Sequence, residues 1–487
     1  MVDKMINTKC SPDFQDKSVV YRTAAFSETI SKVEELATER LKEYHAALKD
    51  RYGDVLLGIE DEFVVSGIHH SEYDAVKQAL HDKLSQDYPT FFSSMDNEHP
   101  LMRVLDSIKA GQNQALHMPR TFRLELVMKH DPEGPEDENH LVRKANALTA
   151  MRRDIEEFIE NYNDEDDIPA AVSWNPRPVP DIYSHLMQVT SLSEDEILED
   201  IKQQVIDRGD IIGADRILAV QSLDELLLGE DPPINNYGAA GSGVHLNLGF
   251  VGKEMDEEGK PINPFYNADE IDIGTPVTWN ASAGLIEVIS QSELVYNSLP
   301  LSSWQRLGNR ELSAPTSVQA GTLKKHGAVI TQSPFSKEFY EHHNVPYKMI
   351  ANEKNVHIEL RNADGGCGPA DGSALILTQL ATTLGAVHYG LNKDAVYSHE
   401  DFMSINYPLS RDYDESASDY KNSNLMRQVL GEDLHRAFFE FTEDKHRQYE
   451  EVFCSSLPEA IQDRYERFED PDGSLTIAES DRVYAMT

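Results

Sequence analysis

The 487-residue sequence predicts an α+β protein, in which helices cover one side of a sheet whose other side is polar. Two patterns predict this fold class. Four segments alternate apolar and polar residues with the period of two that is typical of β-strands. Several longer segments place apolar residues three and four positions apart, as amphipathic helices do. Because alternating strands have one apolar face, we expect the helices to pack on that face.

The first predicted elements are a helix over residues 27–52 and a strand over residues 55–65. Within the apolar strand, Glu60 and Glu62 are two positions apart and therefore share one face. Asp61 points to the opposite face. Isolated buried carboxylates are too costly to keep ionised, so Glu60 and Glu62 imply a cation or an opposing charge nearby.

A second strand over residues 121–128 follows a predicted helix at 71–86 and a stretch that reads as irregular. Its apolar residues occupy alternate positions, which leaves Arg123 and Glu125 together on the other side. An amphipathic helix over residues 137–161 comes next. Glu125 therefore adds a third carboxylate to the polar face.

Two further strands add histidines to that face. A glycine turn that ends at Gly243 leads into a strand in which His245 and Asn247 point the same way. The segment 355–361 has the polar face His357, Glu359 and Arg361. The rest of the C-terminal half predicts helices at 281–297, 373–391 and 425–453 and a polar loop at 400–424.

The converging carboxylates and imidazoles predict a divalent-cation site. Hard cations prefer carboxylate oxygens with an occasional imidazole, and two such ions that neutralise phosphates are a common solution for phosphoryl transfer. The residue types fit Mg²⁺ or Mn²⁺. A different interpretation stays open, because half-exposed antiparallel strands with a solvated polar face show the same alternation.

Composition narrows the classes of partner. The chain has 44 Lys and Arg against 85 Asp and Glu, a net charge of −41, which repels nucleic acids and anionic membranes. Its three cysteines, Cys10, Cys367 and Cys454, are too few and too scattered for a disulfide framework or a zinc cluster. No segment reads as a signal peptide or a membrane span. We therefore expect a cytoplasmic protein that binds neither nucleic acid nor membrane.

Several ordered motifs resemble the glutamine synthetase superfamily of ATP-dependent carboxylate-amine ligases. Glu60-Asp61-Glu62-Phe63 looks like its first metal-ligand strand, and Gly241-Ser242-Gly243-Val244-His245 looks like its glycine-histidine signature. His357-Ile358-Glu359-Leu360-Arg361 looks like its last metal and substrate strand. The remaining motifs are Gly259-Lys260 with Asn263-Pro264-Phe265, Asn297-Ser298, and Gln305-Arg306-Leu307. Ordered motifs together are more specific than any one of them.

This resemblance implies a glutamine synthetase-type catalytic domain, with a curved, mainly antiparallel sheet that has a metal-binding face and is flanked by helices. It implies a role for each candidate residue. Glu62 and Glu125, with His117, would hold one metal ion, and Glu60, His245 and Glu359 the other. Arg361 would contact the phosphoryl group, Arg306 the substrate carboxylate, Gly241 the amino-acid substrate, and Asn247 and His357 ATP. The position of His117 stays open, because a rival alignment runs through Asp106.

The resemblance covers roughly residues 55 to 465 and divides the chain. Residues 1–53 would form an N-terminal helical arm, residues 54–465 the catalytic domain with an insertion at 181–237, and residues 466–487 a tail. Family members have a small β-rich domain before the first metal strand that covers a neighbour's site, and this arm has little room for it. We therefore expect each subunit to build its own site, and a homo-oligomer stays open.

The implied activity is formation of an acyl phosphate from ATP and a carboxylate, by resemblance glutamate, followed by attack of an amine. In the family, a glutamate before an Ala-Pro pair helps to bind ammonium and remove its proton, whereas here Ser313 precedes Ala314-Pro315. An organic amine is therefore the expected acceptor, although Glu311 offers a substitute carboxylate. Four alternatives stay open: a glutamine synthetase that uses ammonia, a glutamate-cysteine-ligase-type enzyme, an inactive relative that binds nucleotide or metal, and a metal-dependent hydrolase.

Overall fold

The computed structural model places helices and strands between residues 24 and 449. The residues that it describes are 24–66, 72–97, 122–129, 137, 139–162, 170–174, 195, 198–199, 201–203, 206, 214–227, 243–259, 261–266, 275–298, 317–321, 327–332, 357–366, 368–393, 397–398, 400, 406–408, 410 and 413–449. Most of the predicted insertion and all of the predicted tail lie outside them. The predicted division of the chain into three segments therefore stays a prediction.

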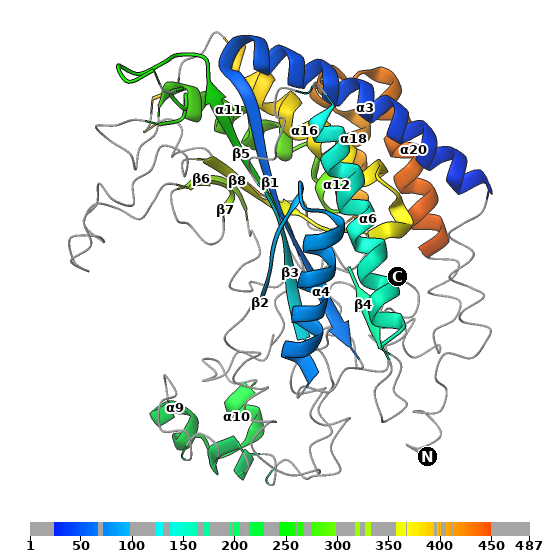
Figure 1. Ribbon diagram of the computed structural model, residues 1–487, viewed down its shortest axis with the longest axis vertical. Helices are drawn as coiled ribbons and strands as arrows, with labels where there is room; N and C mark the ends of the chain where they lie inside the picture. The colour runs from blue at the N-terminus through cyan, green and yellow to red at the C-terminus, as the bar shows by residue number, and fades with distance from the viewer. Residues whose placement is uncertain are drawn as a thin grey trace.

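The described strands form one nine-stranded sheet in the order β2-β3-β1-β5-β8-β7-β6-β9, with β4 paired to β1 (Figure 1). Neighbouring strands are antiparallel except β6 and β7, which run parallel. The strands are β1 (Gly53–Ser66), β2 (Phe92–Asn97), β3 (Phe122–Met128), β4 (Ala171–Ser173), β5 (Val244–Gly252), β6 (Ser317–Gly321), β7 (Gly327–Gln332), β8 (His357–Ala363) and β9 (Asn406–Pro408). The predicted mainly antiparallel sheet is confirmed, and the four strands with the polar pattern are consecutive neighbours in it.

Strand β2 corrects the prediction of an irregular stretch before the second strand. It pairs with β3, and its register shifts between Phe92 and Ser94. Phe92 and Met95 are both buried although they are three positions apart. A bulge of this kind breaks the period of two, so the sequence pattern did not reveal the strand.

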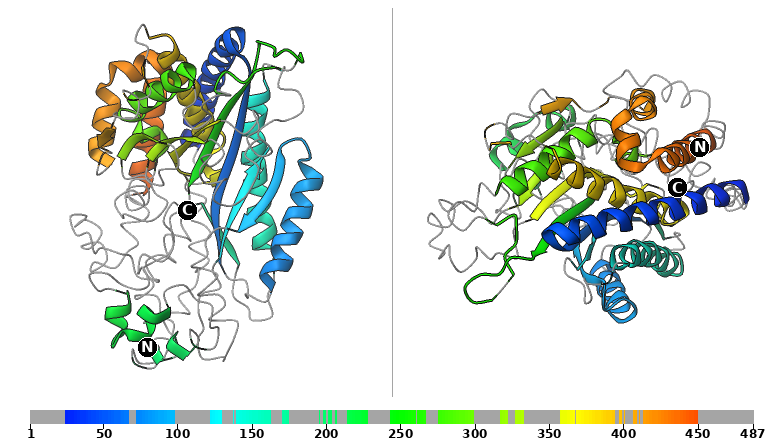
Figure 2. Two further views of the ribbon diagram at one scale, coloured as in Figure 1. Left: turned by 90° about the vertical axis from the view of Figure 1, so that its left-hand side faces the viewer. Right: turned by 90° about the horizontal axis from the view of Figure 1, so that it is seen from above.

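The apolar side chains of β1, β3, β5 and β8 form one core with those of the helices. Figure 2, seen from above, shows the long helix α3 between α6 on one side and α16 and α20 on the other, and α3 contacts all three. The helices are α3 (Ala24–Tyr52), α4 (Tyr73–Asp87), α6 (His140–Glu160), α9 (Ala214–Ala219), α10 (Leu223–Leu227), α11 (Pro276–Ile289), α12 (Glu293–Tyr296), α16 (Ala374–Leu391), α18 (Tyr413–Asn422), α19 (Asn424–Leu430) and α20 (Glu432–Tyr449). The predicted helices at 27–52, 71–86, 137–161 and 373–391 are confirmed.

Two helix predictions need correction. The helix expected at 281–297 begins earlier and is interrupted, because α11 starts at Pro276 behind a capping box between Thr275 and Thr278 and ends at Ile289. The polar loop expected at 400–424 contains α18, which buries Tyr413, Ala417 and Tyr420 at helical spacing. Acidic residues between these positions obscured the apolar stripe of α18.

Helix α16 is the one described helix that is long and apolar enough to cross a membrane by length and composition. Within the fold, 89% of it is buried. It packs against α3 and α11. The helix therefore belongs to the protein core.

Candidate metal and active site

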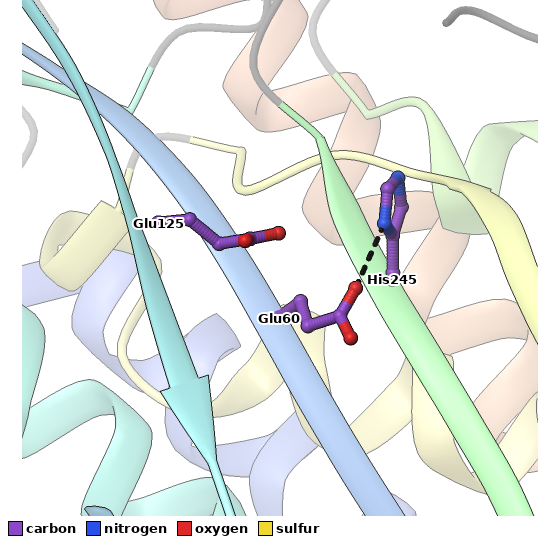
Figure 3. A group of neighbouring side chains, drawn as sticks. All are labelled: Glu60, Glu125 and His245. Atoms are coloured by element: carbon purple, nitrogen blue, oxygen red, sulfur yellow. Dashed lines mark hydrogen bonds and ion pairs between the residues drawn. The ribbon is translucent and has the colours of Figure 1, made fainter. Parts of the chain in front are cut away.

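The sheet brings three predicted ligands together from three neighbouring strands. Glu60 of β1 lies opposite His245 of β5 in the antiparallel register. On the other side of β1, Glu125 of β3 lies opposite Glu62. Figure 3 shows Glu60, Glu125 and His245 pointing toward one another, and one donor atom from each lies within 4.8 Å of the others. Among the described residues, this is the one group of at least three potential ligands that lie close enough together to hold a metal ion.

Strand β8 extends this polar face beyond His245. The Nδ1 atom of His245 lies 3.1 Å from Oε2 of Glu60 and 3.4 Å from Oε1 of Glu359. The Nε atom of Arg361 lies 3.0 Å from the same Oε1 of Glu359. His245 therefore lies between carboxylates from the strands on both sides of it.

A bulge in β8 shapes this part of the face. Val244 pairs with Ala363 and Leu246 with Leu360, so His245 alone lies opposite both Arg361 and Asn362. Bulges increase the local twist of a strand and redirect its side chains. Here the bulge coincides with the strand position where Arg361 joins the face.

Glu62 has a contact that its sequence pattern did not predict. Its Oε2 atom accepts a hydrogen bond of 2.6 Å from the backbone N–H of Gly243, and its own N–H donates to the Gly243 carbonyl at 3.0 Å. The side chain is almost fully buried. Glu62 therefore anchors Gly243, the residue before β5, to β1 while it lies opposite Glu125.

Asn247 also has a contact with a predicted metal ligand. Its Nδ2 atom donates a 3.0 Å hydrogen bond to Oε1 of Glu60. In the ladder, Asn247 lies opposite Glu359 of β8. Asn247 therefore orients a carboxylate, and its predicted contact with ATP stays a prediction.

The electrostatics of the face centre on His245. Burial alone would lower the pKa of His245, but the hydrogen bond to Glu60 and the charges of Glu359 and Glu62 outweigh burial and raise it to about 9. Burial likewise opposes ionisation of Glu60, and its contacts with His245 and Asn247 lower its pKa below the usual range. The metal-free face thus favours the protonated, cationic form of His245 beside the ionised Glu60, so this part of the face stabilises a positive charge.

The donor set fits a hard divalent cation. Carboxylate oxygens from two strands converge, which suit Mg²⁺ and Mn²⁺, and one imidazole joins them as a further possible ligand. The structure brings together Glu60, Glu62, Glu125, His245, Asn247, Glu359 and Arg361, whereas His117, Gly241 and Arg306 lie outside the described residues, as do Asp106, Glu311 and Ser313. His357 is half-buried at the start of β8. Glu125 lies within reach of both predicted ligand sets, so its assignment to one ion stays a prediction.

Comparison with known proteins gives a fold but no sequence relative. No family model and no curated protein matches the sequence. The crystal structure of a novel glutamine synthase homolog matches with a TM-score of 0.51 and 13% sequence identity, over 88% of this chain and 75% of that chain. The two chains share a fold. The predicted glutamine synthetase-type architecture is therefore supported at the level of the fold.

The raised pKa of His245 predicts a pH-dependent metal affinity. A metal ion binds neutral imidazole, so it must displace the proton that His245 keeps below a pKa of about 9. We expect the affinity for Mn²⁺ to rise about tenfold per pH unit from pH 7 to pH 9 and then level off. Calorimetric titrations in two buffers with different protonation enthalpies should show release of about one proton at pH 7.

The same shift has a defined sign for stability. The pKa of His245 in the folded, metal-free protein lies above the ordinary value of 6.5, so this group stabilises the fold fully below pH 6.5. That contribution is lost as the pH rises toward 9.

An Mn²⁺ affinity that is constant between pH 7 and pH 9 would show that the ion does not displace a proton from His245.

Proposed function

We propose that this protein is an ATP-dependent carboxylate-amine ligase that uses two Mg²⁺ or Mn²⁺ ions. The observation that carries the proposal is the convergence of Glu60, Glu125 and His245 on the polar face of the sheet. The shared fold with a glutamine synthase homolog supports this direction. An ordinary solvated sheet face would not place a buried imidazole between carboxylates of two other strands.

Each ion would have its own ligands. Glu60, His245 and Glu359 would hold one, and Glu62 and Glu125, with His117, the other. When bound, the ions would neutralise charge on the phosphoryl group during transfer. The described geometry is compatible with this division, because Glu60 lies opposite His245 and Glu62 lies opposite Glu125.

The proposed reaction has two steps. A carboxylate oxygen of the first substrate attacks the γ-phosphorus of ATP, and the bond to ADP breaks. The nitrogen of an amine then attacks the acyl carbon, the bond to phosphate breaks, and the amine loses a proton. The balance is carboxylate, amine and ATP to amide, ADP and phosphate.

The remaining polar residues have proposed roles around these substrates. Arg361 would steady the transferred phosphoryl group and Arg306 the substrate carboxylate, because a guanidinium fork matches both. Gly241 would let the backbone approach the amino-acid substrate. Asn247 and His357 would contact ATP, and one N–H of the Asn247 amide already donates to Glu60.

We further propose that the acceptor is an organic amine and that the carboxylate is glutamate. By the resemblance, Ser313 takes the sequence position of a glutamate that attracts ammonium, and a hydroxyl neither carries that charge nor acts as a base near neutrality. With glutamate, ATP and Mn²⁺, we expect kcat/KM at least about tenfold higher with a primary amine or amino acid than with ammonium. Phosphate release across a panel of amines, with mass detection of the amide, measures this.

The panel also separates the alternatives. If ammonium gives the highest kcat/KM and glutamine is the product, the protein is a glutamine synthetase in its chemistry despite Ser313. Phosphate release that depends on cysteine would identify a glutamate-cysteine-ligase-type enzyme. Nucleotide and Mn²⁺ binding without turnover would identify an inactive relative, and hydrolysis without ATP a metal-dependent hydrolase.

A further inference from the structure

A buried ion pair lies on the opposite side of β1 from the candidate metal ligands. Asp61 is fully buried, although it stands between Glu60 and Glu62 in the chain. The guanidinium of Arg152 in α6 donates two hydrogen bonds to the Asp61 carboxylate, from Nε to Oδ2 at 2.7 Å and from Nη2 to Oδ1 at 2.9 Å. Such a bidentate pair fixes both distance and orientation. It therefore fixes the backbone of β1 at the residue between the two glutamates.

Arg152 also reaches the chain that leaves β8. Its Nη1 atom donates a 3.2 Å hydrogen bond to the carbonyl of Gly365, two residues after the end of β8. Strands β1 and β8 are not neighbours, because β5 lies between them. No ladder hydrogen bond therefore joins β1 to β8, and Arg152 connects them behind β5.

The surroundings of Arg152 allow it little freedom. Its guanidinium lies 5.2 Å from the ring centre of Trp174, which in turn contacts Phe63 of β1 at 4.8 Å between ring centres. A Cβ atom at Gly365 would come within 3.3 Å of Nη2 of Arg152. A Cβ atom at Gly368, whose φ is +59°, would lie 2.1 Å from the Trp174 ring. The missing side chains make room for the guanidinium and for the ring beside it.

The strands that Arg152 connects carry the carboxylates on both sides of His245. Glu60 of β1 and Glu359 of β8 lie 3.1 Å and 3.4 Å from the same Nδ1 atom. The ladder between β5 and β8 is interrupted by the bulge at this level. Backbone pairing alone therefore constrains the separation of Glu60 and Glu359 less than in a regular sheet.

We infer that Arg152 is a positioning residue, which sets the separation of the metal-binding carboxylates of β1 and β8 from behind the sheet. This inference rests on the proposed function, because it takes Glu60 and Glu359 as metal ligands. Arg152 contacts Asp61 and Gly365, on the opposite side of β1 from the candidate ligands. Its effect passes through Asp61 and Gly365, and ligands held to within about half an ångström are what a two-ion site requires.

Three variants test this inference in the full-length protein. Arg152→Lys keeps the charge but replaces the planar guanidinium fork with a single ammonium, which loses the bidentate contact with Asp61 and holds Asp61 and Gly365 in a different geometry. Gly365→Ala is milder and crowds the guanidinium without removing a charge. The double variant Asp61→Leu/Arg152→Met replaces the buried pair with apolar side chains, a change that often leaves stability unharmed. Phe438→Leu, in the buried face of α20, serves as a control that lowers stability away from the sheet face.

The readouts are the Kd for Mn²⁺ and the electron paramagnetic resonance spectrum of bound Mn²⁺, measured well below each unfolding midpoint. We expect Arg152→Lys and the double variant to weaken Mn²⁺ binding at least about tenfold with an altered spectrum, and Gly365→Ala to do so less strongly. Phe438→Leu should keep the wild-type Kd. A merely structural pair predicts instead that the folded double variant regains wild-type affinity.

The outcomes separate this inference from the proposed function. The positioning role is overturned if Gly365→Ala and at least one of the other two variants keep both the wild-type Kd for Mn²⁺ and the wild-type spectrum. If the wild type binds Mn²⁺ and the variants lose affinity, but no amine supports ATP turnover, the positioning role stands and the ligase proposal fails. If the wild-type protein binds no Mn²⁺, both are overturned.

Discussion

Glu60→Gln is expected to eliminate Mn²⁺ binding at the Glu60–Glu125–His245 cluster and to lower ATP-dependent turnover at least about 10³-fold, equivalent to about 4 kcal/mol of transition-state stabilisation. The Glu60 carboxylate lies next to His245 and also accepts a hydrogen bond from Asn247, so its negative charge lies at the centre of the polar face. A glutamine keeps the shape and an oxygen for Asn247. It cannot neutralise a divalent cation.

The fold should survive this substitution. The Glu60 side chain is 32% exposed, so a neutral amide there can reach water. Circular dichroism and the urea midpoint should stay near those of the wild type, while calorimetry detects the lost Mn²⁺ site. Glu440→Gln, at a side chain of α20 that is 54% exposed, changes the net charge equally and should leave both binding and turnover unchanged. Retention of full turnover by Glu60→Gln would refute the assignment of the site.

Much of the fold was predictable because period and length were clear in the sequence. The polar faces of β1, β3, β5 and β8 followed from alternation alone, and the structure makes these strands consecutive neighbours. Strand β2 was missed because a bulge breaks its alternation. The order of strands in the sheet depends on pairing between residues far apart in the chain, which alternation does not encode.

The residue types that meet in the candidate site were predictable, but their contacts were not. Alternation placed Glu60, His245 and Glu359 on one face, and the register brings the first two directly opposite each other. The bond from Gly243 to Glu62 and the bond from Asn247 to Glu60 depend on the exact register of β1 and β5. A one-residue slip would have sent these side chains to the other face, so no sequence pattern specifies such contacts.

Buried charges left a signal in the sequence that pattern reasoning overlooked. Asp61 continues the apolar alternation of Ile59 and Phe63, which lie in the core. A charged residue at a core position of a strand indicates a buried ion pair. The partner of Asp61, Arg152, lies on a helix that was predicted from its apolar residues alone. Lys445 shows the same signal in α20, because it follows Leu434, Phe438 and Phe441 at helical spacing.

Lys445 and Asp371 form a buried ion pair. We expect the loss of this pair to have a large effect on the stability of the fold. The Nζ atom of Lys445 donates to Oδ2 of Asp371 at 2.7 Å and to Oγ of Ser298 at 3.1 Å. The two charged side chains are 1% and 2% exposed, and Phe441 covers the ammonium at 5.7 Å from its ring centre. Asp371→Ala leaves the ammonium buried without its counter-charge, which should lower the free energy of unfolding by about 3–5 kcal/mol.

Unfolding in urea measures this loss of stability. Asp371→Leu/Lys445→Met removes both charges and fills the space, so it should regain most of the stability that Asp371→Ala loses. Glu440→Ala, which breaks the exposed pair with Lys32, should cost less than about 1 kcal/mol. Equal losses for Asp371→Ala and Glu440→Ala would mean that water reaches Lys445. A sequence in which a lysine falls in phase with an apolar helical stripe would then predict only a solvated charge at the edge of the core.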